Sequence, residues 1–487
     1  MRSQINRHLA GIFATDIPQP SLARLQLTRA GAGEPRHTGL PREFSWHDYA
    51  VYLLHVAAEI EHSLMVQYLY AAYSLGGPGV PQDKCAEVLK WQNLILGVAK
   101  EEMGHFLTVQ NILRLIGGGL NLDRQDFPWD IPFYPYEFAL EPLTRTSLAK
   151  YIFAEAPDDW PPDLTVEERV EIEAAVHKSP RDMPHRVGEL YELMIDILSN
   201  PDAVPDSAFR ESTVPFQASW DEWGRGYNGT QRGTPPKLGP ASPAPNVIVA
   251  RLASRTDAVS SLTLIARQGE WPENDPSVQE LSHFRRFLDI FREFPKADAN
   301  WSPAGQVPTN PQAPGYGNSQ AGPTIEHPES ALWSTLFNIR YRMLLTYLAH
   351  SFRVSADSME TGAANPRSMV INRTFVEMYN LRSTAGILVQ LPLKSDAEPE
   401  RAGPPFQVPY AVQLPSDEAD CWRLHVDLID AAAVLLVRLT EISKDRRADY
   451  AVALLNADRQ ARLQLEPLLQ PSGTGQDAQP RRRSIAI

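Results

Sequence analysis

Cysteine is nearly absent from this chain, which has 487 residues and only two cysteines, Cys85 and Cys421. Two cysteines so far apart in the sequence predict neither a disulfide framework nor a thiolate metal site. Long apolar runs are also missing, so no segment is predicted to span a bilayer. The segment from Met1 to Pro18 lacks the apolar run and small-residue cleavage site of a secretory signal. We therefore expect a cytoplasmic protein with no membrane partner.

A concentrated basic face is the next absence. Lysine and arginine number 46 against 59 aspartates and glutamates, which gives a net charge of -13 and makes nucleic acid an unexpected partner. The closing run Arg481 to Arg483 is short and is predicted to be a solvated tail. The glycine runs at 76–79 and 117–119 lack the context of a phosphate-binding loop and are interpreted as helix ends. The expected partner is a small-molecule substrate.

Helical periodicity dominates the rest of the chain and predicts an all-α fold. The 42 prolines are concentrated in connections, with two rich stretches at 201–245 and 295–328. Connections of this length often form functional lids or packed covers. The first contains Trp220, Trp223 and Tyr227, which would either roof a pocket or wrap the surface. The predicted division is an N-terminal arm at 1–43, a bundle at 44–300, a linker at 301–328, a helical C-terminal region at 329–470 and a tail at 471–487.

Two Glu-x-x-His pairs are the chemical signal. Glu102 and His105 lie on a predicted helix at 83–116, and Glu280 and His283 lie on a second helical piece at 277–294. Residues three apart share a helix face, so each pair can direct a carboxylate and an imidazole at one metal ion. Glu101 lies about 100° around the helix from Glu102 and is interpreted as a flanking residue that orients a ligand.

Glu61 is a single candidate on a predicted helix at 45–75. It interrupts a stripe of apolar residues at helical offsets, where an ionised carboxylate is costly unless something cationic compensates it. A third pair, Glu59 and His62, has more polar residues at helical offsets and is predicted to be a surface pair. Glu61 is therefore preferred to Glu59 as a ligand.

The remaining candidates stay open. In a predicted helix at 184–200, Glu189 and Glu192 both lie on the more polar side, and the acidic run at 167–173 is a further rival. A predicted helix at 246–270 ends near Gly269, which makes Glu270 a rival of Glu280. Helices predicted at 331–352, 370–389 and 417–443 carry no second ligand constellation and are expected to pack on the bundle or to form a homodimer interface.

Together these residues match a known ligand pattern. Single glutamates on two helices and Glu-x-x-His pairs on two others bind the metals of di-iron and di-manganese carboxylate bundles. Carboxylates and imidazoles without thiolates suit iron or manganese. Four carboxylates would balance the charge of two divalent ions in a low-dielectric core.

Several runs of sequence also resemble one family. They are Glu61-His62-Ser63-Leu64-Met65-Val66-Gln67-Tyr68, Ala99-Lys100-Glu101-Glu102-Met103-Gly104-His105-Phe106, Gly188-Glu189-Leu190-Tyr191, Gln268-Gly269-Glu270 and Ser282-His283-Phe284. They resemble the bacterial ferritin-like family that includes the ferritin-like region of VioB, the iminophenylpyruvate dimer synthase of violacein biosynthesis. The resemblance covers about 44–294 and implies a ferritin-like four-helix bundle with a C-terminal helical extension.

The resemblance also implies a ligand set. By position it favours Glu61, Glu102, His105, Glu189 and His283 as metal ligands. For the remaining carboxylate, the family's Gln-Gly-Glu step points to Glu270, whereas helical spacing points to Glu280, and both are kept. The chain departs from the family at Val66-Gln67, where members often carry a Pro-Pro pair, so the pocket shape is not carried over.

Three functional hypotheses follow. The first is a non-heme di-iron oxidase or oxygenase that uses two Fe ions, or Mn, with O2 as co-substrate. Its expected substrate is a small organic molecule, amino-acid-derived or aromatic, in specialised-metabolite biosynthesis. The second is a non-oxidative imine-coupling enzyme similar to the dimer synthase. The third is a structural or iron-binding bundle, which the long extension beyond residue 300 disfavours because storage needs only the bundle.

Overall fold

The computed structural model describes residues 40, 43–124, 134, 136–157, 159–176, 186–224, 246–270, 281–296, 299–315, 322–357, 365–408 and 412–469. In these ranges the regular structure is helical and the β contacts are isolated bridges, which confirms the all-α prediction. The α-helices are α2 Trp46–Ser74, α3 Cys85–Leu115, α4 Arg145–Ala154, α5 Val166–Val176, α6 Val187–Ser199, α7 Trp220–Trp223, α8 Arg255–Glu270, α9 His283–Glu293, α10 Pro328–Ser351, α11 Pro366–Leu388, α12 Glu418–Ile442 and α13 Asp445–Leu465. The short 3-10 helices are η2 Gln82–Lys84, η3 Asp206–Ala208, η4 Glu211–Phe216 and η5 Glu466–Leu469.

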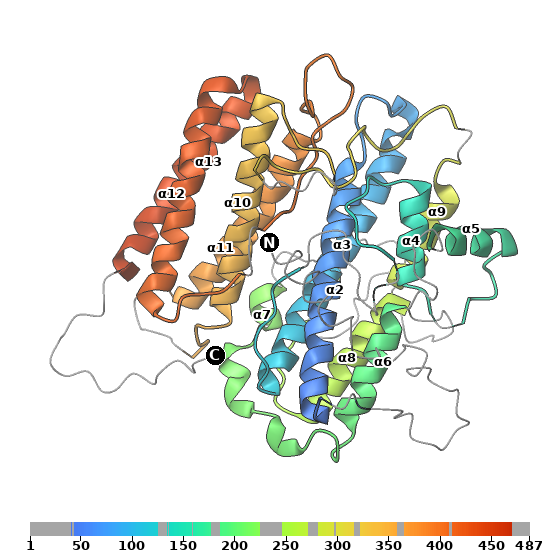
Figure 1. Cartoon of the computed structure of the whole chain (residues 1–487), viewed down its shortest axis with the longest axis vertical. Coiled ribbons are helices and arrows are strands. Elements are labelled where there is room, and N and C mark those ends of the chain that lie inside the picture. Colours follow the sequence, from blue (N-terminus) through green and yellow to red (C-terminus); the bar gives the residue numbers. More distant parts are fainter. Residues whose placement is uncertain are drawn as a thin grey trace, which may run out of the picture.

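The bundle is built around α2 and α3, which pack along one another (Figure 1). α2 begins where Ser45 caps the helix by accepting a hydrogen bond from the Asp48 backbone N–H at 3.1 Å. It then continues for 29 residues without proline, so its backbone ladder is unbroken. α6 pairs with α8 and α4 pairs with α9, so the second half of the bundle consists of two shorter pairs placed along the central one.

The start of α8 corrects the sequence prediction. A helix was expected from residue 246, but α8 begins at Arg255 and residues 246–254 are not helical. This segment lies directly against α3 at Gly104, where a Cβ atom would come within 2.9 Å of Val247 Cγ1 and 3.0 Å of the Ile248 backbone nitrogen. The side chain of Thr108 donates a hydrogen bond to the Ile248 carbonyl at 2.9 Å. Partners on α3 thus replace the helical hydrogen bonds of the segment.

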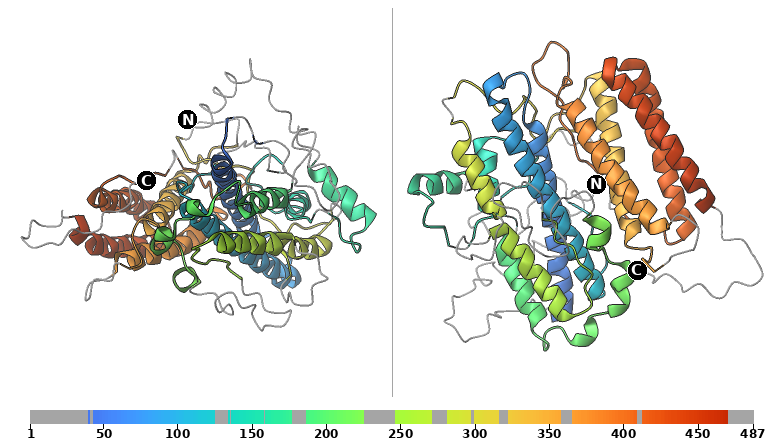
Figure 2. Two further views of the ribbon diagram at one scale, coloured as in Figure 1. Left: turned by 90° about the horizontal axis from the view of Figure 1, so that it is seen from below. Right: turned by 180° about the vertical axis from the view of Figure 1, so that it is seen from behind.

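The helices α10 to α13 form a second group beside the bundle. α10 and α11 lie between the central pair and the outer helices α12 and α13 in all three views (Figures 1 and 2). α13 had not been predicted as a separate helix. No helix in the described ranges has the length and apolarity needed to cross a membrane.

Arg367 of α11 joins the two groups of helices. Its buried guanidinium contacts both oxygens of Glu222, at 2.6 and 2.9 Å, and donates to the backbone carbonyls of Gln217 at 2.6 Å and Val354 at 2.8 Å. Nearby, the Trp223 ring packs on Phe375 of α11 with a centroid distance of 5.6 Å.

The aromatic connection therefore holds the two groups of helices together at Trp223. Trp223 itself is fully buried at this contact. Tyr227 lies outside the described residues.

Candidate metal centre

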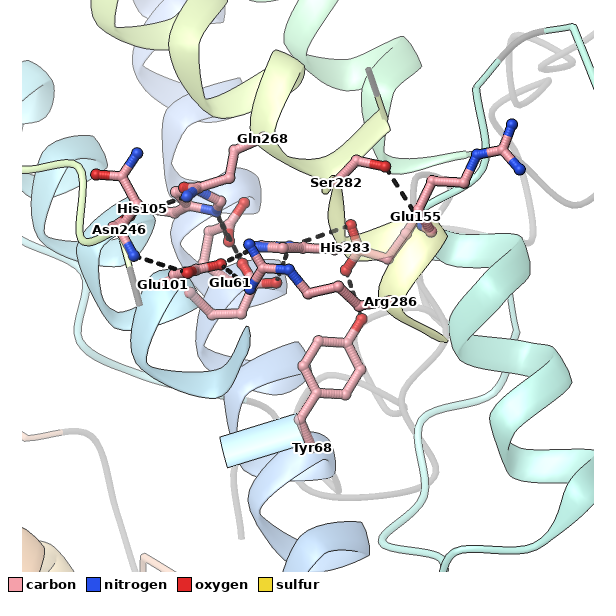
Figure 3. A network of polar contacts seen from close by, with 12 residues as sticks. Glu61, Tyr68, Glu101, His105, Glu155, Asn246, Gln268, Ser282, His283 and Arg286 are labelled. Carbon is pink, nitrogen blue, oxygen red and sulfur yellow. Dashed lines mark hydrogen bonds and ion pairs between the residues drawn. The ribbon is translucent and has the colours of Figure 1, made fainter. Parts of the chain in front are cut away.

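Five acidic and histidine side chains converge in the middle of the bundle (Figure 3). They come from α2, from α3, from the C-cap of α4 and from the first turn of α9: Glu61, Glu102, His105, Glu155 and His283. One cluster joins Glu61, Glu102 and His105, and a second joins Glu102, Glu155 and His283. In each cluster one donor atom per residue lies within 4.8 Å of the others. Glu102 belongs to both clusters.

The first cluster is centred on the imidazole of His105. Its Nδ1 lies 2.8 Å from Glu102 Oε2 and 3.4 Å from Glu61 Oε2. Its Nε2 lies 2.8 Å from the side-chain oxygen of Gln268 on α8. Because Glu102 and His105 are one helical turn apart on α3, the helix itself sets their spacing.

The second cluster is centred on His283, the first residue of α9. The side chain of Ser282 caps this helix and so fixes where it begins. His283 Nδ1 lies 2.9 Å from Glu102 Oε1 and 3.7 Å from Glu155 Oε2. The two imidazole rings stack at a centroid distance of 5.6 Å. The two clusters therefore form one continuous site.

Glu101 holds His283 from the other side of the ring. Its Oε2 lies 2.8 Å from His283 Nε2 and 2.9 Å from Arg286 Nη1. Its Oε1 accepts a hydrogen bond from the Asn246 backbone N–H at 2.7 Å. A carboxylate behind an imidazole is the arrangement that orients metal-binding histidines, so Glu101 has the flanking position expected from the sequence.

Two buried tyrosines hold the outer carboxylates. The Tyr68 hydroxyl donates to Glu155 Oε1 at 2.5 Å, and the Tyr191 hydroxyl donates to Glu61 Oε1. Each of these carboxylates therefore keeps one oxygen directed at the cluster while the other is occupied.

Burial and the charges of neighbouring side chains together shift the pKa values of this site. Burial raises the pKa of Glu61 to about 7, with the carboxylate of Glu102 adding to the rise and His105 opposing it. Burial by itself would lower the pKa of His105, but the carboxylates of Glu102 and Glu61 outweigh it and raise that pKa to about 10. The pKa of His283 is raised for the same reason, with Glu102 and Glu101 outweighing burial. The buried carboxylates are therefore stabilised by positive charge nearby. Either protonated histidines or bound metal ions can supply that charge.

The donor set fits a pair of metal ions. Glu61 Oε2, Glu102 Oε1 and His283 Nδ1 are buried and have no hydrogen-bond partner among the described residues. The last two atoms lie 2.9 Å apart without forming a hydrogen bond. Adjacent ligand atoms on a metal ion with bonds of about 2.1 Å lie roughly 3 Å apart at right angles. Glu102 Oε1 and His283 Nδ1 therefore have the separation of neighbouring ligands.

A cavity of about 20 Å³ is lined by Glu61, Glu102 and His105. A space of that size holds about one water-sized molecule. Its other walls include Gly188 and Tyr191 of α6 and Gly269 of α8.

The structure brings together four of the residues proposed from the sequence: Glu61, Glu102, His105 and His283. Glu189 is in neither cluster, because it lies in the first turn of α6 and its carboxylate accepts from the Arg186 backbone N–H at 3.4 Å. Its neighbours Gly188 and Tyr191 face the cavity instead. The rival Glu192 is exposed and also lies in neither cluster.

Two further candidates are not placed. Glu270 ends α8, but its side chain is outside the described part of the structure, as is the whole of Glu280. The acidic run at 167–173 lies on α5 and forms ion pairs away from the clusters, for example between Glu168 and Arg292 at 2.8 Å.

Glu155 was missed by the sequence analysis. It follows the last residue of a short helix and has no histidine at helical spacing, so only its place in the fold reveals it. The prediction that Glu59 and His62 form a surface pair was wrong for His62, which is fully buried. Its Nε2 lies 2.5 Å from the hydroxyl of Tyr341 on α10. Glu59 accepts instead from the Asn121 side chain at 3.1 Å.

Metal removal should loosen the bundle. Ions that bind only the folded chain stabilise it by roughly 2.7 kcal/mol per site at 100 times the Kd. We expect chelation to lower the Tm by several degrees and anaerobic reloading with Fe(II) to restore it, as measured by circular dichroism. An unchanged Tm in the same protein, with its metal content verified before and after chelation, would argue against a shared buried site.

Comparison with known proteins agrees with the helical arrangement. Residues 54–292 match the family model described as Ferritin-like. Over 412 residues the chain is 28% identical to dichlorochromopyrrolate synthase of Lentzea aerocolonigenes, a match that covers 77% of this chain and 37% of that protein. Over 406 residues it is 25% identical to 2-imino-3-(indol-3-yl)propanoate dimerase of Chromobacterium violaceum, covering 75% of this chain and 34% of that protein. The chain thus spans little more than a third of the length of either relative. No solved structure matches.

Proposed function

Because residues 54–292 form a ferritin-like domain, we propose that this chain is a metal-dependent oxidative enzyme of specialised metabolism. The observation that carries the proposal is the buried Glu102, whose two oxygens face two different histidines, at 2.8 Å from His105 and 2.9 Å from His283. Each histidine has a second carboxylate beside it, Glu61 or Glu155. Glu102 would therefore help to hold both ions of a di-metal site of the carboxylate-bundle kind.

The proposed ligands divide between two ions. Glu61, Glu102 and His105 would hold one ion, and Glu102, Glu155 and His283 the other, with Glu270 retained as a further ligand from the family resemblance. Iron is favoured and manganese is the alternative, because the described donors are oxygen and nitrogen. When bound, a pair of irons would exchange electrons with O2 and with the substrate, which the side chains cannot do.

The protein side chains position and shield this site. Glu101 and Arg286 fix the ring of His283, and Gln268 fixes that of His105. Tyr68 and Tyr191 hold the outer carboxylates in one orientation. Every carboxylate and imidazole of the two clusters is buried, so bulk water is excluded and the ligands are preorganised.

The proposed substrate class is taken from the printed names of the relatives. The name of one relative describes dimerisation of an imino acid that carries an indole ring. We propose an amino-acid-derived imine with an aromatic side chain as the substrate of this chain. Joining two such molecules by a carbon–carbon bond, with one C–H bond lost from each, releases two protons and two electrons. That coupling therefore needs an oxidant, and O2 is the proposed acceptor. A non-oxidative coupling at the same site is the competing hypothesis.

One assay separates these possibilities. The chain is loaded anaerobically with Fe(II), mixed with indole-3-pyruvate and ammonia to generate the imine, and then exposed to limiting O2. We expect a product of twice the imine mass less two hydrogens, formed in proportion to O2 consumed. Dimer formation without O2 or any other acceptor would favour non-oxidative coupling. Uptake of many irons per chain without turnover would indicate iron storage, and absence of metal uptake would overturn the proposal.

A further inference from the structure

A second group of metal-binding side chains lies outside the ferritin-like domain, where the last turn of α10 meets the first turns of α12. His350 comes from α10, and Glu418, Cys421 and His425 come from one face of α12. One donor atom each from His350, Glu418 and Cys421 lies within 4.8 Å of the other two. The sequence had predicted no ligand constellation here, because His350 precedes Glu418 by 68 residues.

Two of the candidate donors, His350 and Glu418, contact one another directly. His350 Nε2 lies 2.9 Å from Glu418 Oε1, so a proton joins these two atoms as a hydrogen bond. A divalent ion bound to both would displace that proton. The other carboxylate oxygen of Glu418 lies 3.4 Å from Arg353 Nε, which leaves Oε1 as the oxygen directed at His350. The Cys421 thiol is held by a weak hydrogen bond to the Pro415 carbonyl, 3.2 Å from Sγ.

His425 stands behind His350. Its Nε2 lies 2.8 Å from His350 Nδ1, and the rings stack at a centroid distance of 5.1 Å. A polar group behind an imidazole fixes the direction in which the opposite nitrogen points. His425 Nδ1 is itself buried and has no hydrogen-bond partner among the described residues. His425 is therefore held by its contacts with His350 and belongs to the surroundings of the candidate donors, not to the donors themselves.

Access to the group comes from one side. His350 and Cys421 are fully buried, whereas the Glu418 side chain is 46% exposed. An ion could therefore enter past Glu418 and meet the thiol and imidazole at the inner end of the group. The donors are also separate from the bundle site, since they belong to different helices and share no residue with it.

We propose that His350, Glu418 and Cys421 bind one divalent ion of the zinc class, with His425 as a positioning residue for His350. A thiolate and a carboxylate together neutralise the charge of the ion, and imidazole completes three ligands of the kind that zinc and cobalt accept. Three protein ligands leave one coordination position for water. The bound ion would fasten the start of α12 to the end of α10.

Cobalt is the probe that distinguishes this site from the bundle site. A thiolate bound to Co²⁺ gives intense near-ultraviolet charge-transfer absorption, whereas the proposed bundle ligands are oxygen and nitrogen. We expect one equivalent of Co²⁺ per chain to produce this band in the full-length protein, and added Zn²⁺ to remove it. The band should disappear in Cys421→Ser. In His350→Asn the apparent affinity for Co²⁺, measured from the same band, should fall by at least tenfold.

Cys85→Ser is the matched control, because Cys85 is exposed and lies at the start of α3. Its band should be unchanged, as should that of His105→Gln, which affects only the bundle. Circular dichroism verifies that each variant is folded, and Glu418→Gln provides a second test if Cys421→Ser does not fold. The absence of a thiolate band in the unaltered protein, or a band that persists in Cys421→Ser, would overturn the proposal.

Discussion

Replacing Glu102 by glutamine is expected to remove both metal ions from the bundle and to lower metal-dependent turnover by at least 100-fold. Oε2 and Oε1 of Glu102 face His105 and His283, so one substitution changes both clusters. Glutamine keeps the shape of the side chain but removes its negative charge and directs an NH2 group at one of the ions. Changes in residues that merely orient a ligand already cost 10- to 100-fold in affinity or activity, and the loss of a shared ligand should cost about 100-fold or more.

The measurement is the number of irons per chain after anaerobic loading and desalting, together with the coupled-product assay. Glu189→Gln is the isosteric control, because Glu189 caps α6 and lies in neither cluster. It should retain two ions, whereas Glu155→Gln should lose the ion held with His283. If instead Glu189→Gln loses metal and Glu155→Gln retains it, the ligand set implied by the family resemblance is the correct one. If Glu102→Gln still binds two ions tightly, the proposal that Glu102 helps to hold both of them is refuted.

Replacing Arg340 by methionine should destabilise the C-terminal helices by about 3–5 kcal/mol. Arg340 of α10 is fully buried and lies 2.9 and 2.5 Å from the two oxygens of Asp458 on α13 and 3.2 Å from Glu377 on α11. Burial raises the pKa of Glu377 even with Arg340 opposing that rise. Without the guanidinium, two buried carboxylates would face one another with nothing to neutralise them.

Guanidinium titration followed by tryptophan fluorescence tests this expectation, because Trp333 and Trp422 lie in these helices. Arg462→Met is the control: Arg462 pairs with Asp430 at 3.0 Å on the surface, and its loss should cost no more than about 1 kcal/mol. In Arg340→Met the carboxyl of Glu377, whose pKa burial already raises, would lose the guanidinium that opposes the rise. The stability lost at neutral pH should therefore be partly regained as the pH falls and Glu377 becomes protonated. Equal effects of the two substitutions would contradict the buried ion network.

The sequence determined those features that one helix can encode. The apolar stripe around Glu61 and the spacing of Glu102 and His105 are local, and the structure places all three in one cluster. The bounds of α2 and α3 also agree with the predicted helices to within a few residues, since the stripe and the absence of proline define them. His283 was predicted as a ligand because it belongs to the second Glu-x-x-His pair. The residues around it in the sequence did not by themselves indicate that it would lie beside α3.

Only the tertiary structure decided which helix ends lie next to one another. Glu155 reaches the site because α4 packs on α9 and ends beside it, a fact that no spacing in its own sequence encodes. Residues 246–254 were expected to be helical, yet side chains of α3 satisfy their backbone in a different conformation. The thiol of Cys421 joins His350 for the same reason, because α10 and α12 lie side by side. Periodicity is a property of neighbours in the chain, whereas a site assembled from the ends of separate helices depends on how those helices pack.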